Sequence, residues 1–341
     1  MDDSVRPGVD IKVTVSSDCI AISDNASGIS AGVAQAHFFE FGRASGDEDS
    51  RDRLSVYGIG LKRAIFKLGR DIVIRSDHID GGFDMHLNVD EWETDPTQPW
   101  TFPLTTRQPA DKDSCGTCIA VSRLNEDAIR RLSDGLFINQ LRESIARTYA
   151  FYMPKYVNIY VNEEIVDQIT FDVGANRTTQ VFAVDGVSCA VSAAIAEPQG
   201  GVFRDRTAGW FVFCNGRNAI YADKTPLTGW STPGSGLPIF QPKHRLFVGT
   251  VFFVSQDPEK LPWTTTKSGI NEDSSIWQEA KRRMIVVGRD LISFLDGRYS
   301  DEGTEVATAD LREVAQARVS LLTAAISESR SRNLLSQVNR L

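Results

Sequence analysis

The sequence has no run of apolar residues long enough to cross a bilayer as a helix. Histidine is rare, with 4 residues in 341, and these show no spacing typical of metal ligands. No serine lies in a nucleophile elbow, and no segment repeats. These absences argue against a helical membrane protein, a histidine-based metal centre, an elbow-type serine hydrolase and a repeat protein.

Cysteine is also scarce, because the chain has 5, an odd and scattered set. Such a set does not form a disulfide framework and is typical of a reducing compartment, so we expect a cytoplasmic protein. Cys115 and Cys118 form a Cys-x-x-Cys pair. A zinc site would need a second pair or suitably spaced histidines, and none is nearby in the sequence. We interpret the pair as two incidental thiols rather than a metal or redox site.

The composition is that of an ordinary globular protein, with 41% hydrophobic and 24% charged residues. A length of 341 residues predicts two domains. The formal charge of −8 argues against non-specific nucleic-acid binding by the whole surface, although a local basic groove stays possible.

The first part of the chain alternates strand and helix patterns. Two strands are predicted within residues 10–24, and a helix over residues 31–42. The charged, glycine-containing segment 43–56 is typical of a mobile surface loop. A helix follows Gly60, and Gly69 is typical of its end. Its apolar face has helical spacing and consists of Leu61, Ala64, Ile65 and Leu68.

The rest of the chain predicts a second region that is richer in strands. Further strands are expected over residues 71–76, 83–89, 117–122, 157–166, 180–196, 209–217 and 246–254. Helices are expected over 126–150, 275–297 and 309–341. A polar break is expected near 174–179, and a loop over 298–308.

Three short motifs follow one another in the first part. Asp24 and Gly28 come directly after a strand, in "AISDNASGIS". Gly58-Ile59-Gly60-Leu61-Lys62 opens a helix, where free backbone N–H groups and the positive end of the dipole suit a phosphate. Gly116-Thr117 begins another strand. Each motif alone is weak, because an aspartate at a strand end is usually a turn former. Their order and spacing together are the stronger signal.

Over about residues 10–165 these motifs resemble the Bergerat-fold ATPases, the group of DNA gyrase, heat-shock chaperones, histidine kinases and MutL (GHKL). "FGRAS…YGIGLKRAIFKLG" is most similar to the MORC-type and prokaryotic members. The resemblance implies an α/β two-layer sandwich that holds ATP between helices and sheet. Segment 43–56 would be the lid over the nucleotide, and Ala26 and Ser55 stand where the family has further glycines.

The same resemblance implies the residues that bind ATP. Asp24 would accept a hydrogen bond from the adenine amino group, and Thr117 would lie beside it. The glycine segments would contact the base and wrap the phosphates. The implied nucleotide-binding residues are Asp24, Gly28, Ile29, Gly58, Ile59, Gly60, Leu61, Lys62 and Thr117.

The second part resembles the ribosomal-S5-like domain that follows the ATPase domain in the gyrase and MutL branch. Asn215-Gly216-Arg217 is similar to a strand turn of the MutL-type domain. Lys267, in "LPWTTTKSGIN", would be the catalytic lysine that reaches the γ-phosphate and stabilises the transition-state charge. Lys62 is the second choice for this contact, and a solvated surface lysine is the plain alternative for either. The implied domains are 1–170, 171–298 and a C-terminal helix over 309–341.

A fourth family motif is not found. It is a helix with a Glu, the general base, and an Asn four residues on that ligates Mg²⁺. No such helix fits between Met1 and the strand that begins at residue 10, and Glu328 and Asn333 are five residues apart. We expect the chain to be a fragment, and a degenerate nucleotide binder is the alternative.

The expected function is therefore that of an ATP-binding, Mg²⁺-dependent GHKL ATPase, a switch that closes and forms a homodimer with ATP. The alternative is an adaptor that binds nucleotide without hydrolysis. A histidine kinase is less favoured, because no phosphoacceptor histidine on a dimerisation helix precedes the motifs.

Overall fold

The structure, a computed structural model, describes residues 8–38, 60–94, 103–153, 156–169, 172–196, 208–232, 234–301 and 319–320. The chain divides into two compact units. The first holds the described residues up to Ala146 together with Tyr152–Gln168, and the second holds Arg147–Phe151 and the residues from Ile169 on. No helix in the described ranges is long and apolar enough to span a membrane.

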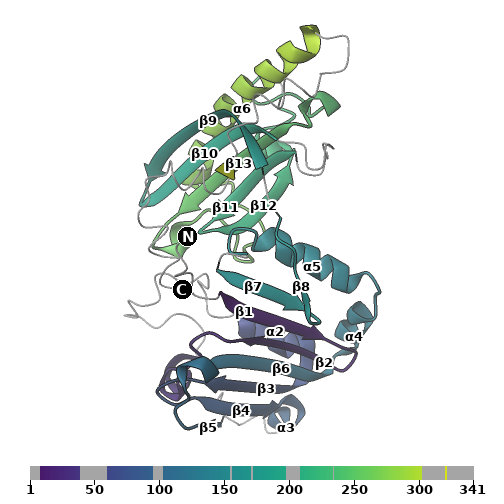
Figure 1. Cartoon of the computed structure of the whole chain (residues 1–341), viewed down its shortest axis with the longest axis vertical. Helices are drawn as coiled ribbons and strands as arrows, with labels where there is room; N and C mark the ends of the chain where they lie inside the picture. Colours follow the sequence, from purple (N-terminus) through teal and green to yellow (C-terminus); the bar gives the residue numbers. More distant parts are fainter. Residues whose placement is uncertain are drawn as a thin grey trace, which may run out of the picture. The chain divides into compact units, whose positions relative to one another are not determined.

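The first unit is built on a mixed sheet with the strand order β5-β4-β3-β6-β2-β1-β7-β8 (Figure 1). Its strands are β1 (Val9–Val15), β2 (Cys19–Asp24), β3 (Gly69–Asp77), β4 (Phe83–Asn88), β5 (Leu104–Thr106), β6 (Gly116–Leu124), β7 (Val157–Val161) and β8 (Glu164–Ile165). Neighbours are antiparallel except β1 and β7, which run parallel with Asp10 opposite Asn158. The strands expected at 10–24, 71–76, 83–89, 117–122 and 157–166 are confirmed.

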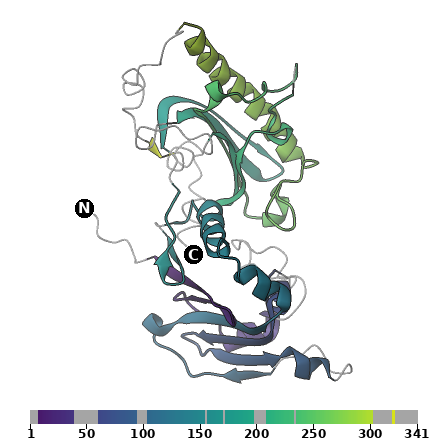
Figure 2. The same cartoon turned by 90° about the vertical axis from the view of Figure 1, so that its right-hand side faces the viewer.

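Helices pack on one face of this sheet, as seen for α2 in Figures 1 and 2. The helical segments are α1 (Ala31–Val33), the π-helical turn η1 (Ala34–Phe38), α2 (Gly60–Leu68), α3 (Val89–Glu93), α4 (Glu126–Leu132) and α5 (Phe137–Thr148). Ile72 and Ile74 of β3 are fully buried beneath them, with Ile65 of α2 in the same core. Val73, between the two isoleucines, is 41% exposed on the other face. This alternation gives a two-layer arrangement with one open sheet face.

The three helix predictions for this unit hold over most of their described residues, with one correction. The helix expected over 31–42 is helical as far as Phe38, and residues 39–42 lie outside the described ranges. The helix after the glycine motif ends at Leu68, as predicted. The helical stretch expected over 126–150 is helical, but it is broken between Leu132 and Phe137 into α4 and α5. There Ser133 Oγ donates to the Ile129 carbonyl, which also accepts from Ser133 N, and Leu136 N donates to Asp134 Oδ1, so local side-chain bonds end the first helix.

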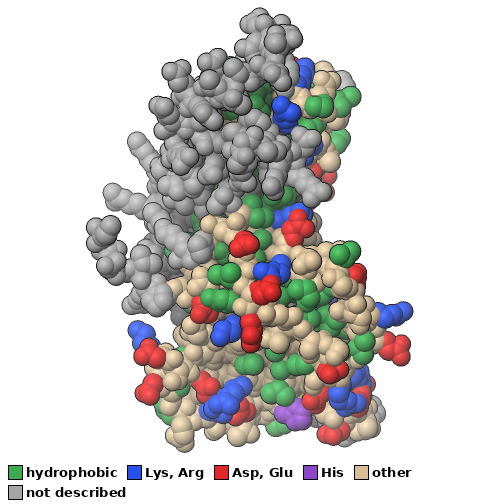
Figure 3. Space-filling model, turned by 45° about the vertical axis from the view of Figure 1, so that its right-hand side comes forward, with side chains coloured by type: hydrophobic (Ala, Val, Ile, Leu, Met, Phe, Trp, Pro, Cys, Tyr) green, Lys and Arg blue, Asp and Glu red, His purple; other side chains and the backbone are tan. Residues whose placement is uncertain are grey.

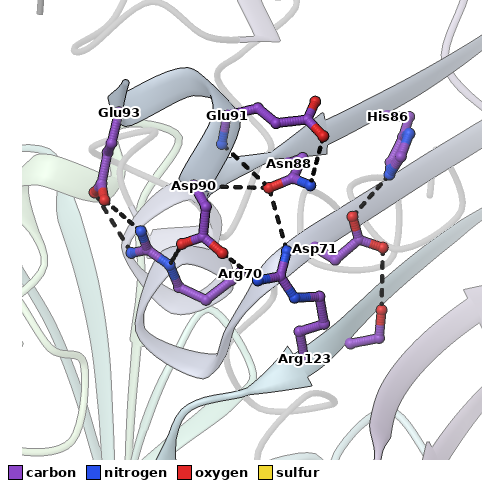
Figure 4. Close-up of polar contacts among 9 residues, drawn as sticks. Arg70, Asp71, His86, Asn88, Asp90, Glu91, Glu93 and Arg123 are labelled. Atoms are coloured by element: carbon purple, nitrogen blue, oxygen red, sulfur yellow. Dashed lines mark hydrogen bonds and ion pairs between the residues drawn. The ribbon is translucent and has the colours of Figure 1, made fainter. Parts of the chain in front are cut away.

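Charged residues fasten α3 to the sheet, as Figure 4 shows. Arg70 of β3 donates to Asp90 Oδ1 at 2.7 Å and pairs with Glu93, both on α3. Arg123 of β6 also pairs with Asp90, and Asn88 caps α3 by accepting from the backbone. The hydrogen bond from Arg70, ahead of that from Arg123, lowers the pKa of Asp90. This network lies in the connection from β4 and has a structural role.

The second unit is a sheet of order β12-β11-β13-β10-β9-β14 that packs against helix α6 (Ser275–Asp301) (Figure 1). Its strands are β9 (Asp172–Val184), β10 (Val187–Ala196), β11 (Gly209–Cys214), β12 (Arg217–Asp223), β13 (Phe247–Val254) and β14 (Val319–Ser320). Short 3-10 turns lie at Pro226–Thr228, Pro242–His244 and Pro258–Lys260. Trp277 and Met284 of α6 are fully buried. Both units are thus of mixed α/β class.

Three predictions for this unit need correction. The polar break expected near 174–179 is strand, because β9 continues through it and Thr179 Oγ1 lies 2.8 Å from Ser192 Oγ on β10. Threonine favours the pleated surface of a strand despite its polarity. Helix α6 continues to Asp301, into the expected loop 298–308. Val319–Ser320 is strand rather than part of a helix over 309–341, whose other residues lie outside the described ranges.

Candidate functional site

The register of three strands brings two of the predicted motifs together. Asp24 on β2 lies opposite Thr117 on β6, and Thr117 lies opposite Ser76 on β3. Residues directly opposite in antiparallel strands project from the same face. The next row holds Ile22, Ile119 and Ile74, and Ile74 belongs to the core under the helices. Asp24, Thr117 and Ser76 therefore lie on the helix-covered face.

Asp24 ends its strand in a tight turn that engages half of its carboxylate. Oδ1 accepts a hydrogen bond from Ala26 N at 2.9 Å. Asn25 fastens the turn to β1, because its Oδ1 accepts from Asp10 N at 2.8 Å. Among the described residues, no donor bonds Oδ2 of Asp24. As far as the described residues go, the half-buried carboxylate thus keeps one oxygen for a further donor.

Two glycines allow the motif segments to approach each other. Gly28 has φ +71°, and a β carbon there would lie 2.0 Å from the Asp77 carbonyl oxygen. A β carbon on Gly116 would lie 2.2 Å from the Asp24 carbonyl oxygen. No other residue fits at either position without backbone movement. The glycine after Asp24 is therefore needed for packing against β3.

Ser76 joins the same two segments and was not singled out from the sequence. Its side chain is fully buried, and its Oγ accepts from Ile29 N at 2.7 Å. The same oxygen lies 3.0 Å from Thr117 Oγ1 and 3.3 Å from the Gly116 carbonyl oxygen. The sequence did hold a signal, because Ser76 continues the inward positions of Ile72 and Ile74. A hydroxyl at an inward position needs partners.

Apolar surface lies next to Asp24 on this face. Ile22, two residues before it, is 46% exposed although its neighbour Ile119 packs against the core. The site so far consists of a carboxylate oxygen, a hydroxyl and an apolar side chain. Such a set suits a flat, mostly apolar ligand with polar edges.

The predicted phosphate segment is described only in part. Gly60 and Leu61 begin α2, Leu61 is 39% exposed, and no acidic residue lies in the first turn of the helix. Ile65 anchors the helix in the core. Gly58, Ile59 and the expected lid 43–56 lie outside the described ranges, as does the side chain of Lys62.

Lys267 belongs to the second unit and is described there by itself. It has φ 55° in a turn where its N–H donates to the Thr264 carbonyl at 2.8 Å. Its Nζ lies 4.8 Å from the ring centroid of Trp263. Burial, and secondly the charge of Arg217, lower the pKa of Lys267. The lysine is thus a half-buried cation with an aromatic neighbour.

The Asn215-Gly216 pair is a hairpin turn between β11 and β12, with φ 44° and 81°. This geometry is that of a type I′ turn, which Asn-Gly favours. Asn215 Nδ2 donates to the Ser255 carbonyl and its Oδ1 accepts from Ser255 N. Arg217 follows the turn and donates to Tyr149 OH at 3.1 Å.

The open face of the first sheet carries a serine, an aspartate and a histidine in contact. His86 Nε2 lies 2.8 Å from Asp71 Oδ1, the pair drawn in Figure 4, and Ser122 Oγ donates to Asp71 Oδ2 at 3.2 Å. The aspartate stands between the other two, whereas a nucleophilic triad needs the histidine in the middle. The contact is therefore a surface hydrogen-bond group.

The described residues indicate neither a metal site nor a disulfide. The part of the chain that the structure describes has no group of three or more His, Cys, Asp or Glu side chains able to hold a metal ion. All five cysteines are free thiols. Basic and acidic side chains are interspersed on the coloured surface of the first unit in Figure 3, and no large patch of one sign is seen in that view.

Comparison with models of known protein families gives no match to the chain, and no curated protein matches it significantly.

Proposed function

We propose that the first unit binds ATP on the helix-covered face of its sheet, with Asp24 as the acceptor for the adenine amino group. The observation that carries this proposal is the row of Asp24 and Thr117 beside the half-exposed Ile22. No described residue donates to Oδ2 of Asp24, and adenine supplies a donor at the edge of an apolar ring. A donor from the ligand at Oδ2 would add a hydrogen bond to a charged group, which is among the stronger kinds.

The phosphates would extend toward the first turn of α2. Its N-terminal N–H groups and the absence of acidic residues in that turn favour an anion. Gly58, Ile59, Gly60 and Leu61 would supply backbone donors, and Lys62 a charge. Mg²⁺ would come with the phosphates, but the described residues offer no ligand set for it, so no step is assigned to the metal.

The finer assignment is a Bergerat-type domain of a GHKL ATPase with an S5-like second domain, and it rests on the sequence resemblance. In this proposal Lys267 approaches the γ-phosphate when ATP is bound, and segment 43–56 closes as a lid. Closure would favour a homodimer and hydrolysis would release it. The mixed α/β class of both units is compatible with this assignment.

The decisive experiment is calorimetric titration of the full chain with ATP and Mg²⁺. Asp24→Asn replaces one carboxylate oxygen by an amide, and we expect a loss of affinity of about tenfold or more, as for a hydrogen bond to a charged group. Asp18→Asn is the matched control, because Asp18 is exposed in the β1–β2 turn. Equal affinity in the wild type and Asp24→Asn would reject Asp24 as the adenine acceptor.

A measurement of ATP hydrolysis distinguishes the ATPase from the adaptor that binds nucleotide without hydrolysis. Phosphate release above background, lowered by Lys267→Met with adenine binding retained, would support the ATPase. Binding without release would favour the adaptor. A non-hydrolysable ATP analogue should raise the dimer fraction in analytical ultracentrifugation if the switch operates.

A further inference from the structure

Ser76 occupies a junction between two segments that are far apart in sequence. Its hydroxyl contacts Ile29 N, in the segment that follows Asp24, and Thr117 Oγ1, at the start of β6. Its side chain is 0% exposed, so water does not replace either contact. The chain separations are 47 and 41 residues, so these bonds hold tertiary rather than local structure.

The hydroxyl of Ser76 has one proton and two acceptors within reach. One lone pair is taken by Ile29 N–H at 2.7 Å. The proton can go to Thr117 Oγ1 at 3.0 Å or to the Gly116 carbonyl at 3.3 Å, and Thr117 Oγ1 is the nearer acceptor. When Ser76 donates to Thr117, the Thr117 proton is directed away from Ser76. Thr117 lies between Ser76 and Asp24 in the sheet, so the proton then points toward the Asp24 side.

We propose that Ser76 is a positioning residue that sets the direction of the Thr117 hydroxyl and thereby selects adenine over guanine. This inference rests on the proposed function of the site. A Thr117 hydroxyl that donates away from Ser76 suits N1 of adenine, which is an acceptor, and opposes N1–H of guanine, which is a donor. The Asp24 carboxylate is an acceptor and therefore suits the adenine amino group, which is a donor. Ser76 acts through Thr117 and does not itself touch the base.

The test measures the affinities of the full chain for ATP and GTP by calorimetry. Ser76→Ala should weaken the binding of ATP about tenfold, the cost of a lost buried hydrogen bond, and change the binding of GTP little. The ratio of the ATP affinity to the GTP affinity should therefore fall. Ser122→Ala is the matched control, because Ser122 Oγ lies on the same sheet and bonds Asp71 on the open face. Its ratio should equal that of the wild type.

A double-mutant cycle with Thr117→Val distinguishes positioning from a structural role. If Ser76 acts through Thr117, Ser76→Ala has no further effect on the ratio in the Thr117→Val background. Ser76→Cys keeps a weak donor and similar volume, and it carries the test if the alanine variant does not fold. An unchanged ATP/GTP ratio in folded Ser76 variants, or additive effects in the cycle, would overturn the inference.

The measurements also distinguish a failure of the positioning role from a failure of the proposed ATP binding. If ATP binding is weakened by Asp24→Asn but not by Ser76→Ala, the proposed function is supported and the positioning role is rejected. No ATP binding by the wild type rejects both.

Discussion

The guanidinium of Arg107 lies 2.7 Å from the carboxylate of Asp77, measured from Nε to Oδ1. Asp77 is also the residue whose carbonyl leaves no room for a β carbon at Gly28. A second bond of Arg107 reaches Asp84 Oδ2 at 2.7 Å on β4. The ion pair of Arg107 and Asp77 thus stabilises the strand end against which the Gly28 turn packs.

Arg107→Ala should lower the free energy of unfolding by about 1 kcal/mol, because the pair is partly exposed and screened. The hydrogen bond from Arg107 lowers the pKa of Asp77, so its stabilisation is present above the ordinary aspartate pKa and is lost as the pH falls through the lowered one. Urea unfolding at neutral and acid pH measures both effects. Arg130→Ala, at an exposed pair on α4, is the control, and an equal change there would contradict a special role of Arg107.

Gly28→Ala should destabilise the first unit by about 2 kcal/mol or more, because a left-handed backbone and a carbonyl contact oppose the methyl group. Gly32→Ala is the matched control, since no heavy atom lies within 4 Å of a β carbon at that position in α1. We expect it to be neutral in chemical denaturation. A Gly28→Ala protein as stable as the control would show that the turn can move.

His244 should make the second unit sensitive to mild acid. It is 1% exposed, its Nδ1 accepts from Gln241 N, and Asp296 and Lys243 lie beside it. Burial lowers the pKa of His244 below its ordinary 6.5, against the opposing effect of Asp296. The unfolded chain therefore binds the proton first, so stability is full above 6.5 and falls below it until the lowered pKa is passed.

The variant His244→Asn keeps an acceptor for Gln241 N and cannot titrate. We expect a flatter dependence of the melting temperature on pH below 6.5 than in the wild type, although the smaller side chain lowers stability at every pH. An unchanged slope would assign the acid sensitivity to other groups.

Arg217→Gln should raise the pKa of Lys267, because the charge of Arg217 is one of two causes that lower it. The burial of Lys267 remains, so the pKa should rise only in part. Titration of the carbon next to the lysine nitrogen by NMR measures this. Arg282→Gln, at an exposed pair on α6, should leave the Lys267 titration unchanged, and a fall in the Lys267 pKa with Arg217→Gln would contradict the prediction.

The strands of the first unit were predictable because their apolar alternation agrees with burial on one sheet face, as at Ile72 and Ile74. The break between α4 and α5 was not, because it depends on local hydrogen bonds of Ser133 and Asp134 rather than on the apolar pattern of the segment. The first part of strand β9, through residues 174–179, was missed because its pairing with β10 depends on residues outside the segment.

In the site, Asp24, Gly28 and Thr117 could be singled out only because three short motifs follow one another in an order and spacing that resemble a known family, since each motif alone is weak. That Asp24 and Thr117 lie opposite each other depends on strand register, which no single segment encodes. The inward position of Ser76 indicated that its hydroxyl needs partners, but which partners could not be predicted, because Ile29 and Thr117 belong to two other parts of the chain.

The parallel pair of β1 and β7 has a consequence for how the first unit forms. Asn158 Nδ2 donates to Asp10 Oδ1 at 2.9 Å, across 148 residues of sequence. Closing so long a loop is entropically costly, and such a high contact order slows folding. During translation the β1–β2 hairpin must wait for β7 to leave the ribosome, so the N-terminal strand is exposed to mispairing for most of the synthesis of its own unit.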